Sequence, residues 1–163
     1  KPIFYIANIS DDNHSDKHLE NLKNYAESMY QDVIPVQIKL EEEISVLDET
    51  EKKEFLLLEG IEEPALNKII RKGFKILGLE TFFTAGPNEL RAWTINKGSL
   101  APQAAGKIHT DFERGFIKAE TISFNDFISL GGESAAKENG KLRLEGKDYV
   151  VKDGDIIHFK FNV

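Results

Sequence analysis

The first half of the chain alternates between short apolar runs and stretches of helical spacing. Residues 3–9 form a nearly continuous apolar run, which is typical of a strand buried on both faces. Apolar residues between 19 and 29 recur at helical spacing, and residues 33–40 alternate as a second strand does. A strand, a helix and a strand in this order predict a parallel sheet with helices packed on it.

Two more helices are expected before residue 79. Asp48 and Glu51 have the spacing of a capping box, and Gly60 is placed to end the helix that they open. Pro64 suits the first turn of the next helix, which Gly78 ends. Residues 41–43, three consecutive Glu, are expected in a solvated turn. Two strands make a poor sheet alone, so we interpret this half as the end of a larger α/β domain.

The second half has the pattern of a mixed sheet. Strands at 80–85 and 89–96 flank a Gly-Pro-Asn turn, which indicates a hairpin. The other predicted elements are a helical turn at 101–106, a strand at 116–123, a helix at 124–130, and strands at 142–144, 149–151 and 156–163. About five strands with a short helix across them are typical of a β-grasp, or ubiquitin-like, fold.

Composition and charge separate the same two halves. The 163 residues carry a net charge of −7, but residues 1–79 hold 10 basic and 16 acidic side chains, whereas residues 80–163 hold 11 and 12. We therefore expect one domain at 1–79 and another at 80–163. The charge argues against a uniformly basic nucleic-acid binder and leaves room for a local basic patch.

Two absences narrow the chemistry. The chain has no Cys, which excludes disulfides, thiol catalysis and Cys-ligated metals and fits a cytoplasmic protein. It has no apolar run of about 18 residues, so no membrane partner is expected.

The first candidate site follows the first strand. Asn8, Ile9 and Asp11 come at its carboxyl end, where open α/β sheets bind ligands. An Asn amide can pair with the Hoogsteen edge of a purine, and an acid three residues later can face an amino group of the base. The same residue types also favour an ordinary turn after a strand, so both interpretations stay open.

The second candidate is the segment 107–118, which interleaves cations with aromatic residues. Lys107, Arg114 and Lys118 could contact phosphates while Phe112 and Phe116 stack on bases, and Arg91 would extend this basic face. The alternative is that the Phe residues are core and the charges are a solvated edge. Trp93 alternates with Arg91 and is expected in the core.

Several catalytic hypotheses fail on the sequence. His109 and Asp111 suit a local hydrogen-bonded turn better than a triad, which geometry alone can establish. The four His offer no metal set. Neither the G-x-x-x-x-G-K-[ST] nor the G-x-G-x-x-G phosphate loop occurs, so no catalytic residue is predicted, and this chain alone is not expected to hydrolyse nucleotides.

Longer motifs in the second half resemble a known family. They are LETFFTAG at 79–86, RAWTI at 91–95, APQAAGKIHTDFE at 101–113, GFI at 115–117, EGKDY at 145–149 and DGDII at 153–157. Together they resemble the C-terminal part of YchF-type proteins, also called EngD, which are Obg-related P-loop ATPases or GTPases. The resemblance covers essentially the whole chain.

This resemblance implies a remnant of a P-loop G domain at 1–79 and an α+β TGS domain of β-grasp fold at 80–163. The family's base-recognition motif is Asn-x-x-Glu, which is linked to a preference for ATP over GTP. Asn8 matches it and Ile9 falls where the family places a residue against the base, but Asp11 replaces the Glu and leaves ATP against GTP open. Residues 37–39 occupy the equivalent of the next G-domain loop, and no role is carried over to them.

The resemblance also implies a functional setting. ATP or GTP with Mg²⁺ would bind the full-length parent, which we expect to be monomeric and cytoplasmic, and no nucleotide is expected on this chain alone. The chain begins with Lys1 rather than Met, so we expect it to be a fragment. The TGS domain would bind RNA or the ribosome in translation-linked regulation, with contacts at Arg91, Lys107, His109, Arg114 and Lys118. The alternative is a ubiquitin-like protein-interaction module without RNA contact.

Overall fold

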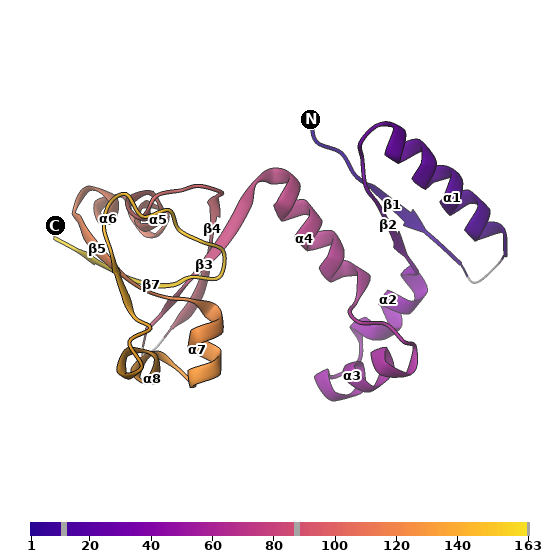
Figure 1. Ribbon diagram of the computed structural model, residues 1–163. Helices are drawn as coiled ribbons and strands as arrows, with labels where there is room; N and C mark the ends of the chain where they lie inside the picture. Colours follow the sequence, from indigo (N-terminus) through magenta and orange to yellow (C-terminus); the bar gives the residue numbers. More distant parts are fainter. Residues whose placement is uncertain (11–12, 87–88, 163) are drawn as a thin grey trace. The chain divides into compact units, whose positions relative to one another are not determined.

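The computed structural model describes residues 1–10, 13–86 and 89–162, and the chain divides into two compact units. The first unit is Lys1–Leu77 and the second is Gly78–Val163. Each unit has its own sheet, and Figure 1 colours both along the sequence.

The first unit is built on two parallel strands, β1 (Tyr5–Asn8) and β2 (Val33–Val36), joined by α1 (Asn13–Ser28). Figure 1 shows α1 running alongside this pair. The prediction of a strand buried on both faces is wrong for this chain. A two-stranded sheet leaves one face open, so β1 alternates between half-buried and exposed residues, and Ile6 is 51% exposed.

The second strand is shorter than predicted because a helix follows it. β2 ends at Val36, and α2 (Ile38–Ser45) takes up the rest of the predicted strand and the three Glu residues. The alternation at 36, 38 and 40 fits a strand, but Leu40 and Ile44 also have helical spacing, and Ile44 is buried. The expected solvated turn at 41–43 is therefore wrong: Glu41 accepts hydrogen bonds from Ala65 N at 2.6 Å and Leu66 N at 3.3 Å.

The last two helices of the first unit begin and end close to the predicted residues. Helix α3 (Glu49–Leu58) opens with the predicted capping box: Asp48 Oδ1 accepts from Thr50 N and Glu51 N, and Glu51 accepts from Asp48 N. Helix α4 (Ala65–Leu77) is followed by Gly78, whose φ of +64° suits glycine.

The second unit holds a mixed five-stranded sheet in the order β4-β3-β7-β5-β6. The strands are β3 (Leu79–Ala85), β4 (Leu90–Asn96), β5 (Phe116–Ile122), β6 (Arg143–Glu145) and β7 (Ile156–Phe161). β3 and β4 form the predicted hairpin, and β7 is parallel to β3 but antiparallel to β5. The predicted strand at 149–151 is reduced to one bridge between Leu100 and Val150, since backbone hydrogen bonds hold this segment to residues 99–101.

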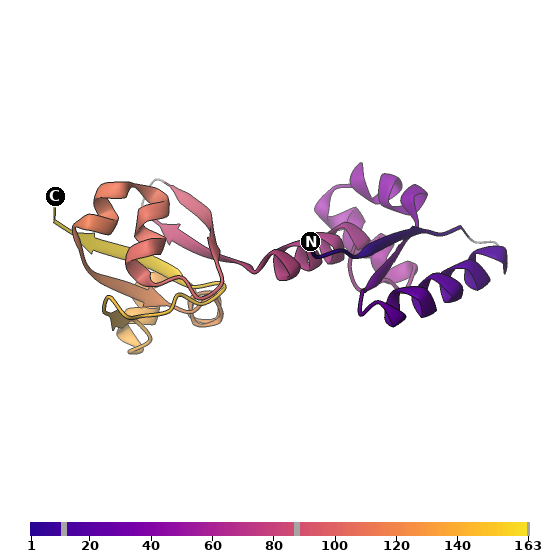
Figure 2. The same cartoon turned by 90° about the horizontal axis from the view of Figure 1, so that it is seen from above.

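Helices α5 (Ala101–Ile108) and α6 (Thr110–Arg114) lie over one face of this sheet, as Figure 2 shows. Ala104 and Ala105 are fully buried, and their small side chains let α5 approach the sheet closely. The predicted turn at 101–106 is too short because the helix continues through Gly106. Helix α7 (Phe124–Leu130) is the predicted helix, whereas α8 (Glu133–Glu138) was not predicted.

Candidate functional site

The first unit has a pocket of about 950 Å³ at the carboxyl end of its two strands. Asn8 and Ile9 are there, as predicted, whereas Asp11 lies outside the described residues. The described residues that line it are Asn8, Ile9, Ser10, Gln37, Ile38, Lys39, Leu40, Glu43, Glu59 and Ile61.

The parallel pairing of the strands creates this pocket. Asn8 is in register with Val36, and Ile9 N donates a hydrogen bond to Val36 O at 2.9 Å. The chain after β1 and the chain after β2 therefore leave the sheet at the same edge. The segment 37–39, to which sequence reasoning gave no role, faces the same cavity as Asn8.

The charged groups that line the pocket are two carboxylates, Glu43 and Glu59, and one amine, Lys39. The carboxylates accept hydrogen bonds from amino groups, and the Lys39 ammonium can contact an anionic group. Asn8 is exposed at the pocket and carries both a donor and an acceptor, as recognition of a base edge requires. The volume and the polar groups of the pocket can accommodate a purine base.

The residues predicted to contact RNA lie on two different faces of the sheet in the second unit. Lys107 is exposed in the last turn of α5, and Arg114 is exposed at the end of α6. Lys118 is opposite Lys160, which alternates along β7 with the core residue Phe159. Since successive strand residues point to opposite faces, Lys118 lies on the face away from α5 and α6.

His109 has a structural role that explains its position. It is the N-cap of α6, and its Nδ1 accepts a hydrogen bond from Asp111 N at 3.2 Å. The prediction of a local hydrogen-bonded turn is confirmed. The side chain is still 59% exposed, so the imidazole remains accessible at the α5–α6 junction.

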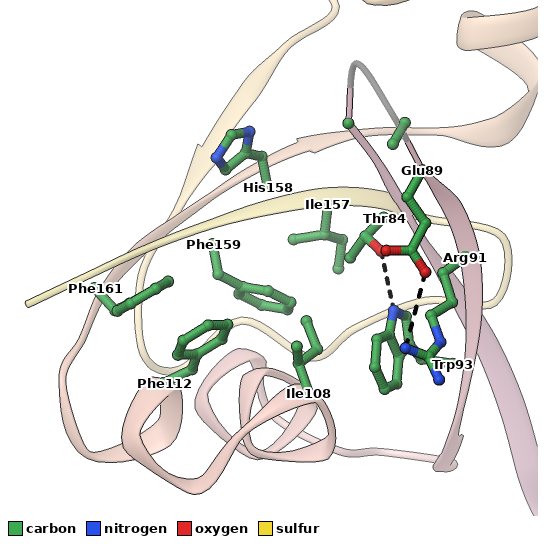
Figure 3. Close-up of a pocket in the computed structure, with 12 residues that line it drawn as sticks. Thr84, Glu89, Arg91, Trp93, Ile108, Phe112, Ile157, His158, Phe159 and Phe161 are labelled. Atoms are coloured by element: carbon green, nitrogen blue, oxygen red, sulfur yellow. Dashed lines mark hydrogen bonds and ion pairs between the residues drawn. The ribbon is translucent and has the colours of Figure 1, made fainter. Parts of the chain in front are cut away.

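Arg91 lies at a second pocket, between the β3–β4 hairpin and helices α5 and α6 (Figure 3). Its guanidinium carbon is 4.4 Å from the centre of the Trp93 ring, and its Nη1 is 3.9 Å from Glu89. The pocket holds about 400 Å³, and its apolar wall consists of Trp93, Ile108, Phe112, Ile157, Phe159 and Phe161.

Sequence reasoning missed this aromatic pocket. Arg91, Trp93 and Ile95 share one face of β4, but Ile95 is buried, Trp93 is half-buried and Arg91 is exposed. The alternation identified the face correctly and placed Trp93 too deep in the core. Arg91, two residues before Trp93 on the same face of β4, was the signal in the sequence that could have placed Trp93 at the edge of a pocket.

A buried carboxylate holds the last loop of the second unit. Asp155 is 2% exposed and accepts hydrogen bonds from the Tyr149 hydroxyl at 2.6 Å, Lys152 N at 3.0 Å and Arg143 Nη2 at 3.3 Å. Burial, followed by the hydrogen bond and the charge of Asp155, raises the pKa of Tyr149 to about 12 despite the opposing charge of Arg143. This cluster has a structural role in the second unit, where it orders the loop that leads into β7.

The raised pKa of Tyr149 predicts a loss of stability in strong alkali. Because the folded state holds this proton more tightly, the stabilisation is complete below pH 10 and disappears as the pH rises from 10 to about 12. We expect urea unfolding to show a smaller fall in stability over this range for Tyr149→Phe than for the unchanged chain. An equal fall in the free energy of unfolding for both proteins would contradict the raised pKa of Tyr149 as its cause.

Two kinds of feature are absent from the residues that the structure describes. Residues 1–10, 13–86 and 89–162 contain no helix long and apolar enough to cross a membrane. Nor does this part of the chain contain a group of three His, Cys, Asp or Glu side chains that could hold a metal ion.

Comparison with known proteins places the chain in a family. Residues 79–162 match the family model YchF-GTPase_C, whose description is "Protein of unknown function (DUF933)". The chain belongs to this family. It is 54% identical over its whole length to the "Ribosome-binding ATPase YchF" of Escherichia coli O157:H7 and 50% identical to that of Bacillus subtilis. It spans 45% and 46% of the lengths of these relatives.

Two solved structures resemble the chain over nearly its whole length. The YchF GTPase of Schizosaccharomyces pombe matches with a TM-score of 0.83 and 36% identity, over 98% of this chain and 43% of that one. A GTP-binding protein from Pyrococcus horikoshii OT3 matches with a TM-score of 0.61 and 20% identity, over 99% and 46% of the two chains, which shows the shared fold alone.

Proposed function

We propose that this chain supplies base recognition and RNA binding to a cytoplasmic, ribosome-binding nucleotide protein of the YchF type. In this proposal the first unit is the end of a P-loop G domain, and the second is a TGS domain. The observation that carries the proposal is the identity of 54%, over the whole chain, to a relative named a ribosome-binding ATPase.

The pocket at the carboxyl end of β1 and β2 supports the role of the first unit. Asn8 would pair with the edge of the base, and Ile9 would contact its ring. This sequence contains no phosphate loop. In this proposal the phosphate loop belongs to the part of the longer relatives that this chain does not match.

The strand order supports a β-grasp fold for the second unit. β7 is the central strand and runs parallel to β3. The antiparallel pair β3–β4 lies on one side of it and the antiparallel pair β5–β6 on the other. Helix α5 packs across one face of the sheet. The exposed cations on α5 and α6 and the exposed Arg91 on β4 offer phosphate contacts on that face.

Charge neutralisation tests the RNA-binding role. We expect replacement of Arg91, Lys107 and Arg114, the exposed cations of this face, by Ala to weaken binding of the chain to ribosomal RNA by about tenfold or more and to reduce its salt dependence. The matched control replaces three other exposed cations, Lys137, Lys147 and Lys152. Equal losses in both variants, or no loss in the first, would contradict this basic face.

A protein-interaction role is the second candidate. Three apolar side chains of the second unit, Leu90, Ile117 and Leu144, are 72%, 56% and 62% exposed. Such side chains suit an interface with another protein. Binding to ribosomes that survives nuclease treatment and is lost on replacing these residues by Ser would favour this role.

A further inference from the structure

We propose that the pocket between the β3–β4 hairpin and helices α5 and α6 binds one unpaired RNA base that carries an exocyclic amino group. This inference rests on the proposed RNA binding and assigns it a definite site. The pocket is in the second unit, whereas the pocket lined by Asn8 is in the first.

The shape and lining of the pocket fit a flat ring. Its volume of about 400 Å³ is within the usual range for small-molecule sites, about 300–1,000 Å³. Figure 3 shows Trp93 on one side and Phe112 on the other, with Phe159 between them. Stacking on aromatic side chains is how proteins commonly hold unpaired bases.

The aromatic walls are held in place by their neighbours. Trp93 Nε1 donates a hydrogen bond to Thr84 Oγ1 at 3.0 Å, which fixes the indole across the hairpin. Phe112 is stacked on Phe161 with 3.7 Å between ring centres. A base entering the pocket would therefore meet ordered rings at Trp93 and Phe112, with the Arg91 guanidinium 4.4 Å from the centre of the Trp93 ring as its polar neighbour.

The polar groups that line the pocket favour some bases over others. Glu89 supplies a carboxylate, which accepts hydrogen bonds from the exocyclic amino groups of adenine, cytosine and guanine. Uracil offers it only the N3–H, which stands between two carbonyl oxygens that a carboxylate repels. Arg91 lies beside it and can pair with a ring nitrogen, a carbonyl oxygen or the adjoining phosphate.

The same polar groups favour a base over an apolar protein side chain. A leucine or phenylalanine entering the pocket would cover Arg91 and Glu89 without offering them hydrogen bonds, which is costly. A base presents donors and acceptors at its edge, and its phosphate would meet the exposed Lys107, next in sequence to the pocket residue Ile108. Charge complementarity therefore points to RNA.

Trp93 allows a direct test, because it is the single tryptophan of the chain and lines the pocket. Short single-stranded oligomers of A, C or U are titrated into the full chain at low salt while its fluorescence is recorded. We expect A and C oligomers to quench Trp93 and to bind about fivefold or more tightly than U oligomers.

Three variants of pocket residues and one control variant separate the contributions of the ring, the carboxylate and the guanidinium. Phe112→Leu removes a ring while keeping apolar volume, and we expect it to weaken A and C binding about fivefold or more. Glu89→Gln should bring the affinities for C and U together. Arg91→Ala should weaken all oligomers, whereas Lys97→Ala, which removes an equal charge outside the pocket, should have a smaller effect.

The outcomes distinguish the site from the broader function. RNA that binds without quenching Trp93, with equal affinity for A, C and U and no response to Phe112→Leu, would overturn the base pocket and leave RNA binding intact. No binding of any RNA would overturn both. Loss of ribosome binding in Phe112→Leu with unchanged oligomer affinity would identify a protein occupant and overturn the base pocket.

Discussion

We expect the replacement of Asp155 by Ala to lower the free energy of unfolding of the second unit by about 3 kcal/mol, since it leaves several buried donors without their acceptor. Asp155 is 2% exposed and accepts hydrogen bonds from Tyr149, Arg143 and the backbone of Lys152. Its own backbone carbonyl also accepts from Phe83 N at 2.8 Å, so the loop that it orders enters β7 beside β3.

Urea unfolding followed by Trp93 fluorescence measures this effect, because the single tryptophan is in the second unit. Tyr149→Phe, which removes one of the donors, should cost about 1 kcal/mol. Asp148→Ala is the matched control, as this carboxylate is exposed. A change below about 0.5 kcal/mol for Asp155→Ala, the usual size for a surface substitution, would show that the cluster does not stabilise the unit.

The second large effect is expected from Gly115→Ala, which should destabilise the second unit by about 2 kcal/mol through overpacking. A Cβ on Gly115 would lie 2.9 Å from the carbonyl carbon of Asn162 and closer still to its oxygen. Backbone cannot move aside as a side chain can, because Asn162 N donates to Gly115 O at 2.9 Å and fixes the two chains together.

Gly146→Ala provides the control for this substitution. A Cβ on Gly146 meets no atom within 4 Å, so we expect almost no loss of stability. Thermal unfolding by circular dichroism should show a clear fall in melting temperature for Gly115→Ala alone. Similar melting temperatures for the two variants would mean that the end of β7 yields to the added methyl group.

Local patterns predicted most of the strands and helices, and they failed where one pattern fits two structures. The hairpin around Gly86 followed from alternation on both sides of a turn, and Asp48 with Glu51 marked the start of α3. Val36, Ile38 and Leu40 suit a strand and a helix equally over so short a run, and helix α2 formed because Ile44 becomes buried. The open face at Ile6 depends on how many strands pair, which no local pattern records.

The first site was easier to predict than the second. Asn8 follows a strand in a parallel pair, and strand ends meet at one edge by topology alone, so its pocket could be anticipated. The aromatic pocket depends on how far α6 carries Phe112 from the hairpin and on which residue of β4 reaches the rim. Lys118 and Arg91 lie on opposite faces of the sheet, and the face of Lys118 follows from the register of β5 with β7.

Co-sedimentation of the full chain with purified ribosomes, over a range of salt concentrations, tests the central claim most directly. We predict that the chain pellets with ribosomes at low salt and is released steeply as salt rises, because phosphate contacts exchange with counterions. A chain that remains in the supernatant at low salt, or one whose binding is indifferent to salt, would contradict RNA recognition by the second unit.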